Sequence, residues 1–196
     1  MTAQIGDQFR YKNAEFEITA QRPHLQFNPL DYGIIPEAAC TACWRGFWCV
    51  YDISPDGIFL SDLYINSAVD YYPEICGVRP EKRAEDDFLS YMGHQLYKGL
   101  NIKIPYTGKI LIGDNFSHLF YIHNGFQCPW GYRKLIELVF EDGKLIAANN
   151  HSRIAAKIRR KRIAEDYEMP NLFKQIIKPC RKINVWWYRD IDDIER

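Results

Sequence analysis

Two segments built around glycines constrain the fold of this chain more than any other feature. In residues 43–60, a run of aromatic and β-branched residues turns at Pro55-Asp56-Gly57. Residues 106–146 begin with Tyr-Thr-Gly-Lys-Ile at 106–110, continue through largely apolar runs at 120–123 and 135–140, and then turn at Asp142-Gly143. Asp-Gly between apolar runs is typical of a β-hairpin, because both residues tolerate the positive φ of a tight turn. The two segments therefore predict a twisted antiparallel sheet.

The N-terminal region adds a shorter hairpin. Apolar and polar residues alternate in residues 9–11 and 15–18, on either side of Lys12-Asn13-Ala14. This alternation predicts two strands that share one buried and one wet face. Residues 22–39 and 67–79 are rich in proline and glycine, so we expect ordered loops there. The first of these loops is expected to be anchored by Phe27, Tyr32 and Ile34.

A helix is predicted over residues 80–98. Pro80 suits a first helical turn, and acidic residues follow it, near the positive end of the helix dipole. Gly99 follows the last residue, as at many helix ends. One apolar stripe recurs every four residues: Ala84, Phe88, Met92 and Leu96.

Residues 149–196 have a helical pattern. Ser152 suits an N-cap, and isoleucines recur on one face after it. A short helix is expected at 170–177 and another at 183–194, although residues 185–188 alone would equally suit a strand. The predicted fold is α+β: a largely antiparallel β-rich domain over 1–148 with one packed central helix at about 80–98, and a helical C-terminal extension over 149–196.

The overall composition excludes several classes of protein. Lys+Arg and Asp+Glu both number 25, so the chain lacks the basic excess of a dedicated duplex-binding protein. No stretch approaches the roughly 20 apolar residues that a membrane-spanning helix needs. The N-terminus shows no signal region, so we expect a cytoplasmic protein whose cysteines are reduced thiols.

Few residues have spacings suited to chemistry. Cys40 and Cys43 have the spacing of a zinc-binding pair, but no second pair accompanies them, so we expect buried thiols and neither metal nor cofactor. His118 and His123 would lie on opposite faces of a strand over 120–123, which rules out a shared metal ion. Each of these histidines remains a candidate for a single acid or base, and a small hydrolase remains an alternative.

The strongest charge asymmetry is a basic run after residue 152. A helix there would carry cations around much of its circumference, and these suggest an alternative function in RNA or DNA binding. The residues of this alternative are Arg153, Lys157, Arg159, Arg160 and Arg162. A solvated helix explains the same run without any function.

Two strings of aromatics and glycines carry a resemblance to known proteins. Residues 43–53 (Cys-Trp-Arg-Gly-Phe … Tyr-Asp-Ile) and 106–126 (Tyr-Thr-Gly-Lys-Ile … Tyr-Ile-His-Asn-Gly-Phe) resemble small bacterial proteins that are similar to immunity proteins of polymorphic or contact-dependent inhibition toxins. The resemblance covers about residues 5–148. It implies a protein without catalytic residues that binds and neutralises a toxin domain, and many such toxins are nucleases.

Acidic patches would suit such a partner, because carboxylates attract the basic groove of a nuclease. The first candidate patch is Glu81, Glu85, Asp86 and Asp87. The second is in the C-terminal tail: Asp190, Asp192 and Asp193. Helix capping and solubility explain both patches equally well.

Overall fold

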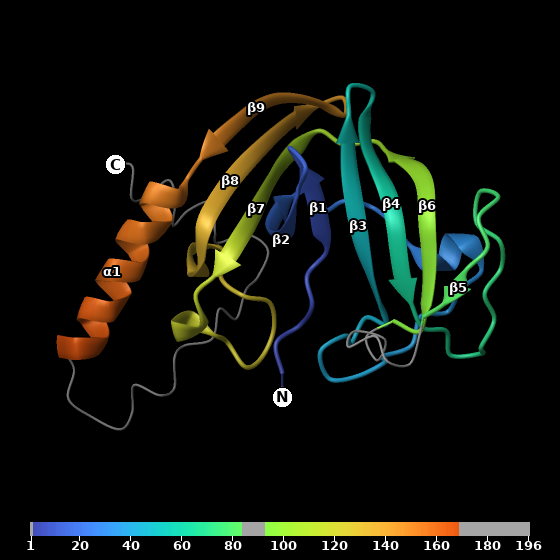
Figure 1. The fold of residues 1–196 in the computed structure, drawn as a ribbon, viewed down its shortest axis with the longest axis horizontal. Coiled ribbons are helices and arrows are strands. Elements are labelled where there is room, and N and C mark those ends of the chain that lie inside the picture. The colour runs from blue at the N-terminus through green and yellow to red at the C-terminus, as the bar shows by residue number, and fades with distance from the viewer. Residues whose placement is uncertain (1, 84–92, 169–196) are drawn as a thin grey trace.

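The computed structural model describes residues 2–83 and 93–168 (Figure 1). Within these residues, nine strands form one sheet in the order β5-β6-β4-β3-β1-β2-β7-β8-β9. The strands are β1 (Gln8–Tyr11), β2 (Ala14–Arg22), β3 (Phe47–Ser54), β4 (Gly57–Ile65), β5 (Glu81–Lys82), β6 (Gln95–Ile104), β7 (Gly108–Phe116), β8 (Tyr132–Glu141) and β9 (Lys144–Asn150). One α-helix, α1 (Ser152–Glu168), follows β9. Three short 3-10 helices lie in the connections: η1 (Pro29–Tyr32), η3 (His118–Phe120) and η4 (Pro129–Gly131).

The sheet is largely antiparallel, which confirms the α+β class at this level. The three hairpins predicted from the turn residues are present as β1–β2, β3–β4 and β8–β9. One pair is parallel: β1 lies beside β3, with Gln8 opposite Val50. This pair joins the N-terminal hairpin to the β3–β4 hairpin and makes the sheet mixed.

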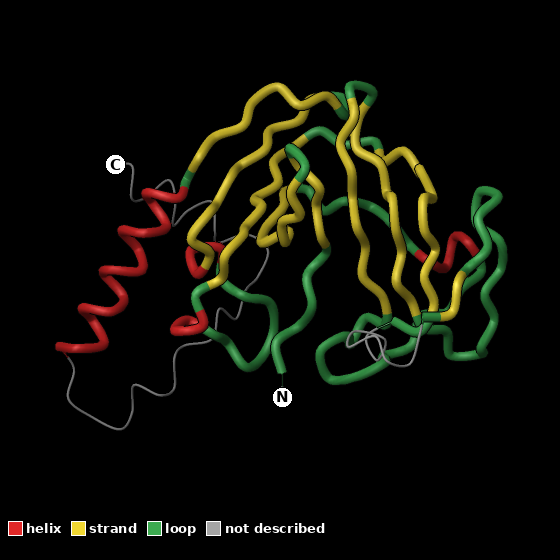
Figure 2. Tube along the Cα trace, in the orientation of Figure 1, coloured by secondary structure: helices red, strands yellow, loops and turns green. Residues whose placement is uncertain are grey.

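The sheet curves into an arch, with β8 and β9 on one side and β4 and β6 on the other (Figures 1 and 2). Register shifts in β2, β3 and β4 accompany this curvature, as expected because bulges increase local twist. The two Asp-Gly turns meet at the top of the arch. A Cβ atom added to Gly143 would lie 3.5 Å from the Cα of Gly57.

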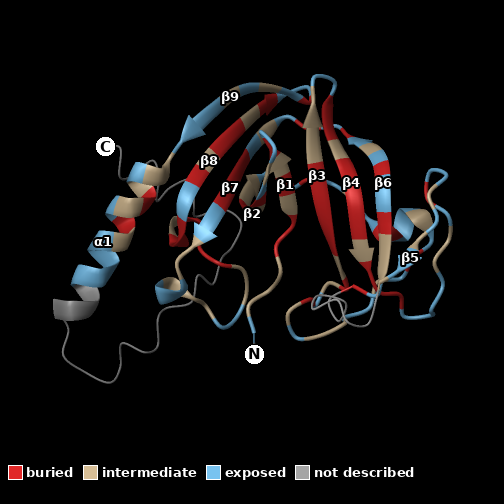
Figure 3. Ribbon diagram, viewed as in Figure 1, coloured by how far each residue is buried: buried red, intermediate tan, exposed pale blue. Residues whose placement is uncertain are grey.

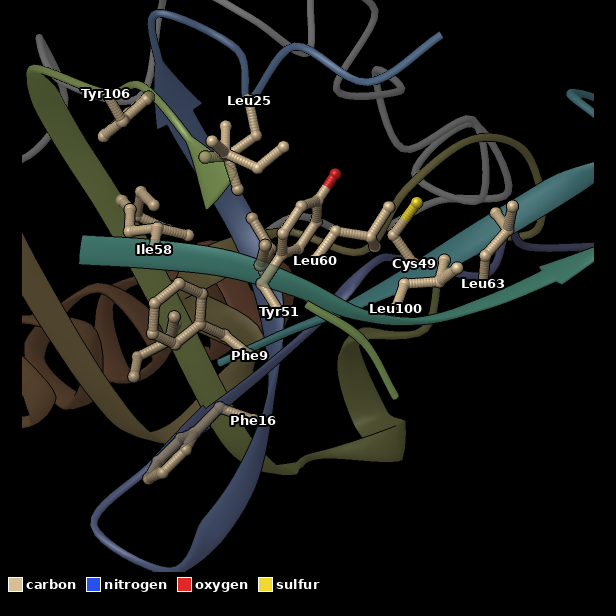
Figure 4. Close-up of a cluster of buried hydrophobic side chains, with 14 of the residues drawn as sticks. Phe9, Phe16, Leu25, Cys49, Tyr51, Ile58, Leu60, Leu63, Leu100 and Tyr106 are labelled. Atoms are coloured by element: carbon tan, nitrogen blue, oxygen red, sulfur yellow. The ribbon is translucent and has the colours of Figure 1, made fainter. Parts of the chain in front are cut away.

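The inner face of the arch holds the main core (Figure 4). Phe9, Tyr51, Ile58, Leu60 and Tyr97 are each at most 2% exposed. Phe9 also packs against Phe140, with ring centroids 6.2 Å apart, so side chains from both sides of the arch meet. Burial of this size is the main term that stabilises such a domain.

The outer face is covered only in part (Figure 3). Ala155 of α1 is fully buried in a cluster with Leu111 and Leu135, so the helix packs on β7 and β8. At the opposite side of the arch, Trp48 and Tyr64 stack with their ring centroids 3.8 Å apart. Of the described helices, none is both long and apolar enough to cross a membrane.

The predicted central helix over 80–98 is wrong at both ends. Glu81–Lys82 is strand β5, and Gln95–Ile104 is strand β6, which pairs with seven residues of β4. Residues 84–92 lie outside the described residues. The helical spacing at Leu96 was misleading because pairing with a buried neighbouring strand overrides local propensity. Gly99 has φ +75° and stands where the β4–β6 register shifts, instead of ending a helix.

The predicted strand over 120–123 is also wrong, because this segment follows the 3-10 helix η3 and pairs with no strand. The helix predicted after residue 152 is confirmed as α1. The helices predicted at 170–177 and 183–194 lie outside the described residues. The two predicted loops are ordered: Ile34 is fully buried, and Phe27 stacks on Tyr32 at 5.7 Å between ring centroids.

Candidate functional site

The structure describes one of the seven acidic residues proposed to bind a partner. Glu81 lies in the short edge strand β5 and is exposed. The other six lie outside the described residues: Glu85, Asp86, Asp87, Asp190, Asp192 and Asp193. The predicted patches therefore stay predictions.

The basic residues of α1 divide into two groups. Arg159 donates from Nη1 to the carbonyl oxygens of Trp130 and Tyr132, at 2.6 and 2.5 Å. Arg162 lies over the ring of Trp130, with 5.8 Å from its Cζ to the ring centroid. These two side chains attach the helix to η4 and β8. The other three residues named for nucleic-acid binding, Arg153, Lys157 and Arg160, are exposed.

The cysteines offer little chemistry. Cys40 and Cys43 are free thiols, and Cys43 is 1% exposed in a cluster with Trp48. Burial raises the pKa of Cys43 to about 11, so this side chain is a buried thiol at neutral pH. The described residues contain no group of three side chains placed to hold a metal ion. Cys128 is disulfide-bonded, so the expectation of reduced thiols throughout is wrong for this residue.

The two histidines lie in the loop between β7 and β8. His118 is in η3, exposed, with its ring edge-on to Phe116 at 5.9 Å. His123 is also exposed and meets Tyr121 edge-on at 5.0 Å. Since neither lies in a strand, the argument from opposite strand faces does not apply to them.

Two ion-pair clusters link strands on either side of β1. Arg10 pairs with Asp62 at 2.6 Å, Glu15 at 2.9 Å and Asp52 at 3.2 Å, and so connects β1 to β2, β3 and β4. Asp7 pairs with Arg45, which precedes β3 in the sequence. The carboxylates in these clusters are saturated by partners within the fold, as expected for groups that hold the sheet together.

A third cluster lies on the outer face of β8. Glu137 is 7% exposed and accepts hydrogen bonds from Asn149 at 3.1 Å and Lys109 at 3.4 Å. The Nε2 atom of His151 lies 3.8 Å from the same carboxylate. The pKa of Glu137 is lowered to about 2, and His151 is the largest cause. Asn149 and Lys109 also lower this pKa, whereas burial acts in the opposite direction.

This cluster predicts acid sensitivity. The pKa of Glu137 in the folded protein, about 2, is below the ordinary value of 4.5, so its stabilisation is present above about pH 4.5 and is lost as the pH falls toward 2. The expected loss in the free energy of unfolding is about 2–3 kcal/mol. We expect Glu137→Gln to remove this part of the pH dependence of unfolding, measured by urea denaturation at near-neutral and acidic pH. Glu141→Gln, at an exposed position on the same strand, is the control. An unchanged acid dependence in Glu137→Gln would contradict the assignment.

The largest group of exposed apolar side chains lies on two loops. Leu30, Ile35, Val69 and Tyr71 are between 50% and 60% exposed, and we call them the loop patch. Two backbone hydrogen bonds join the loops. The N–H of Ala68 donates to the Ile35 carbonyl at 3.0 Å, and the N–H of Glu37 donates to the Asn66 carbonyl at 3.1 Å. Apolar side chains exposed together are unusual on monomer surfaces and mark interaction sites.

The same two loops carry exposed carboxylates. Asp31 and Glu37 are exposed on the first loop, and Asp70 is exposed on the second. In the described part of the chain, none of the three forms an ion pair. The two loops therefore combine exposed apolar side chains with carboxylates that form no ion pair. Sequence analysis missed it because irregular loops carry no periodic pattern, although the exposed Ile35 and Val69 next to buried anchors were a usable signal.

Comparisons of the chain with protein-family models, curated proteins and solved structures found no match.

Proposed function

We propose that this protein is a non-enzymatic binding protein, and that the loop patch is where it contacts a basic protein partner. The observation that carries the proposal is the grouping of four exposed apolar side chains with three unpaired carboxylates on two hydrogen-bonded loops. Apolar and aromatic side chains supply most of the binding energy at protein interfaces, and charges at the edge steer the partner.

Buried side chains and a hydrogen bond hold the two loops in place, and this also favours the proposal. Beneath the patch, Ile34 and Ile75 are at most 1% exposed in the main core. The hydroxyl of Tyr72 accepts a hydrogen bond from the backbone N–H of Ser67 at 3.0 Å. A rigid surface loses little conformational entropy on binding, so its contacts are converted efficiently into affinity.

The distribution of polar groups argues against a reaction at the sheet. The carboxylates of the Arg10, Asp7 and Glu137 clusters already have cationic partners within the fold. A general acid or base needs a proton-accepting atom within reach of a substrate. Within this class of binding proteins, we propose an immunity protein that neutralises a toxin domain, since a basic nuclease groove would complement the carboxylates on the two loops.

The alternative of nucleic-acid binding is less well supported. Two of its five residues, Arg159 and Arg162, contact the protein itself. The other three, Arg153, Lys157 and Arg160, are exposed on α1.

The test uses the toxin domain encoded next to this protein. We expect the two proteins to co-purify, with an affinity that falls as salt concentration rises, and we expect the protein to protect cells that express the toxin. Val69→Arg should weaken binding at least about tenfold, as a hot-spot loss of at least 1.4 kcal/mol would.

The matched control is Ile146→Arg, because Ile146 is 59% exposed on β9, away from the loop patch. It should bind like the unmodified protein. Equal weakening by both substitutions would show that the loop patch is not the contact surface. Absence of both binding and protection would overturn the immunity proposal.

A further inference from the structure

One carboxyl group in the fold has no positively charged partner. Five carboxylates in the described residues are buried or half-buried: Asp7, Glu17, Asp52, Asp62 and Glu137. All except Glu17 lie within ion-pair distance of an arginine or a lysine. A charged group away from water is costly unless it is paired, so Glu17 requires an explanation.

Glu17 lines a pocket of about 200 Å³ on the outer face of the sheet. The walls come from β2, β7, β8 and the loop around η3, and they include Phe116, His118, Tyr121 and Tyr132. The N-terminal segment forms the remaining side. It is fixed there by hydrogen bonds from Gln4 N–H to Gly125 at 2.9 Å and from Ile5 N–H to the carbonyl of residue 42 at 2.8 Å.

Three glycines allow the pocket side chains to lie directly on the backbone. A Cβ at Gly6 would approach the Glu17 carboxyl oxygen to 2.7 Å, one at Gly113 would approach the Tyr132 ring to 2.5 Å, and one at Gly131 would approach the Phe116 ring to 2.6 Å. None of these three glycines has the positive φ that by itself favours glycine. The arrangement of Glu17, Tyr132 and Phe116 therefore depends on the small size of these glycines.

The aromatic rings stand at steep angles around the carboxyl. The rings of Phe116 and Tyr132 are 5.1 Å apart at 60°, and those of Phe116 and His118 are 5.9 Å apart at 85°. The hydroxyl of Tyr132 is buried beside the Glu17 carboxyl without a hydrogen bond of normal geometry. The pocket therefore combines this polar pair with the rings of Phe116, His118 and Tyr121, and its remaining walls include Gln4, Gln8 and Gln127.

We propose that this pocket binds an alkylated ammonium group, which supplies the cation that Glu17 lacks. Aromatic faces attract such cations through their quadrupole, and a carboxylate at the base of the pocket adds direct charge pairing. A methylated ammonium carries its charge on an apolar surface, so it loses less hydration on entering an aromatic pocket than a primary ammonium does. The group can belong to a small molecule such as choline or to a trimethyllysine side chain.

The titratable groups that line the pocket besides Glu17 are His118, Tyr121 and Tyr132. Burial raises the pKa of Glu17, and the neighbouring Tyr132 hydroxyl partly opposes this rise. A bound cation favours the carboxylate form of Glu17, so affinity for the cation should increase as the pH rises and Glu17 loses its proton.

The experiment is calorimetric titration of the full chain with choline and with its uncharged isostere 3,3-dimethyl-1-butanol. We expect choline to bind and the isostere to bind at least about tenfold more weakly, since shape is matched and only the charge differs. A peptide bearing trimethyllysine, against the same peptide with unmodified lysine, distinguishes the two sources. Tighter binding of the peptide than of choline assigns the site to a side chain, and the reverse assigns it to a free small molecule.

Three variants test the geometry. Glu17→Gln should weaken choline binding at least about tenfold and remove most of its pH dependence. Gly6→Ala should also weaken binding, because its methyl group displaces the end of the Glu17 side chain without touching the backbone. Glu15→Gln is the control: it lies on the same strand but is exposed and paired with Arg10, so it should bind like the unmodified protein. Equal binding of choline and its isostere, or no binding of any cation at millimolar concentration, would overturn the proposal while leaving the loop patch untouched.

Discussion

Gly46→Ala is expected to destabilise this protein by about 2–5 kcal/mol, whereas Gly33→Ala should cost only about 1–2 kcal/mol. Both glycines have nearly the same left-handed backbone, with φ +77° and +76°. That conformation costs any L-residue about 1–2 kcal/mol. At Gly46 a Cβ would also overlap the backbone of Glu37, with its carbon and nitrogen at 2.6 Å, whereas at Gly33 nothing lies within 4 Å.

The overlap at Gly46 cannot be relieved by a rotamer change, because the obstructing atoms belong to the backbone. Overpacking of this kind costs about 1–3 kcal/mol and occasionally more. The pair of variants is measured by urea denaturation with one common m-value. If the two substitutions cost the same, backbone conformation alone would explain Gly46 and the close approach would be irrelevant.

The same position has a consequence for binding. The carbonyl of Gly46 accepts a hydrogen bond from the N–H of Asn66 at 2.9 Å. The carbonyl of Asn66 in turn accepts a hydrogen bond from the N–H of Glu37. Gly46 therefore holds together the two loops that carry the loop patch. This hydrogen bond continues the β3–β4 ladder past the Phe47–Ile65 pair, so its loss should disturb the loop patch and this end of the hairpin together.

Local turn chemistry explains which parts of the fold were predictable. The Asp-Gly dipeptides at 56–57 and 142–143 and the alternation at 9–18 are short-range signals, and the hairpins they predict are present. The parallel pairing of β1 with β3 was not predictable from these signals, because it joins residues about 40 positions apart through an irregular loop. Long-range pairing depends on the total burial that the arch achieves.

The errors have related causes. At Leu96 a four-residue apolar spacing suggested a helix, but the segment from residue 95 pairs with the buried strand β4. At residues 120–123 the apolar run suggested a strand, but η3 precedes it and Gln127 fixes the loop through two hydrogen bonds to Ile122 at 2.9 Å. In both places, contacts with distant or non-periodic parts of the chain outweighed local preference.

The candidate sites were less predictable than the fold. The isolated position of Glu17 can be recognised only when the partners of the other four carboxylates are known. The loop patch depends on two loops about 30 residues apart that become neighbours through the bridge between Pro36 and Ser67. Sequence patterns detect charges and apolar residues, whereas a site is defined by which of them remain unpaired after folding.

Asp7→Ala is expected to have the second large effect, about 2–4 kcal/mol of lost stability. The carboxylate is 8% exposed and pairs with Arg45, whose Nη1 lies 3.0 Å away. It also accepts a hydrogen bond from the backbone N–H of Cys49 at 2.7 Å. Truncation leaves this N–H without an acceptor in the core and leaves the guanidinium without a counter-charge. Because the Arg45 side chain is 35% exposed, water offsets part of the loss.

The control for Asp7 is Glu74→Ala, which breaks the exposed pair of Glu74 with Arg79. Exposed ion pairs contribute only about 0–1 kcal/mol, so this variant should unfold at nearly the same urea concentration as the unmodified protein. The double substitution Asp7→Ala/Arg45→Met should cost less than the sum of the single changes, since it removes the unpaired charge as well as its partner. Strict additivity would mean that the two side chains do not interact energetically, and that the pair does not fasten the chain before β1 to β3.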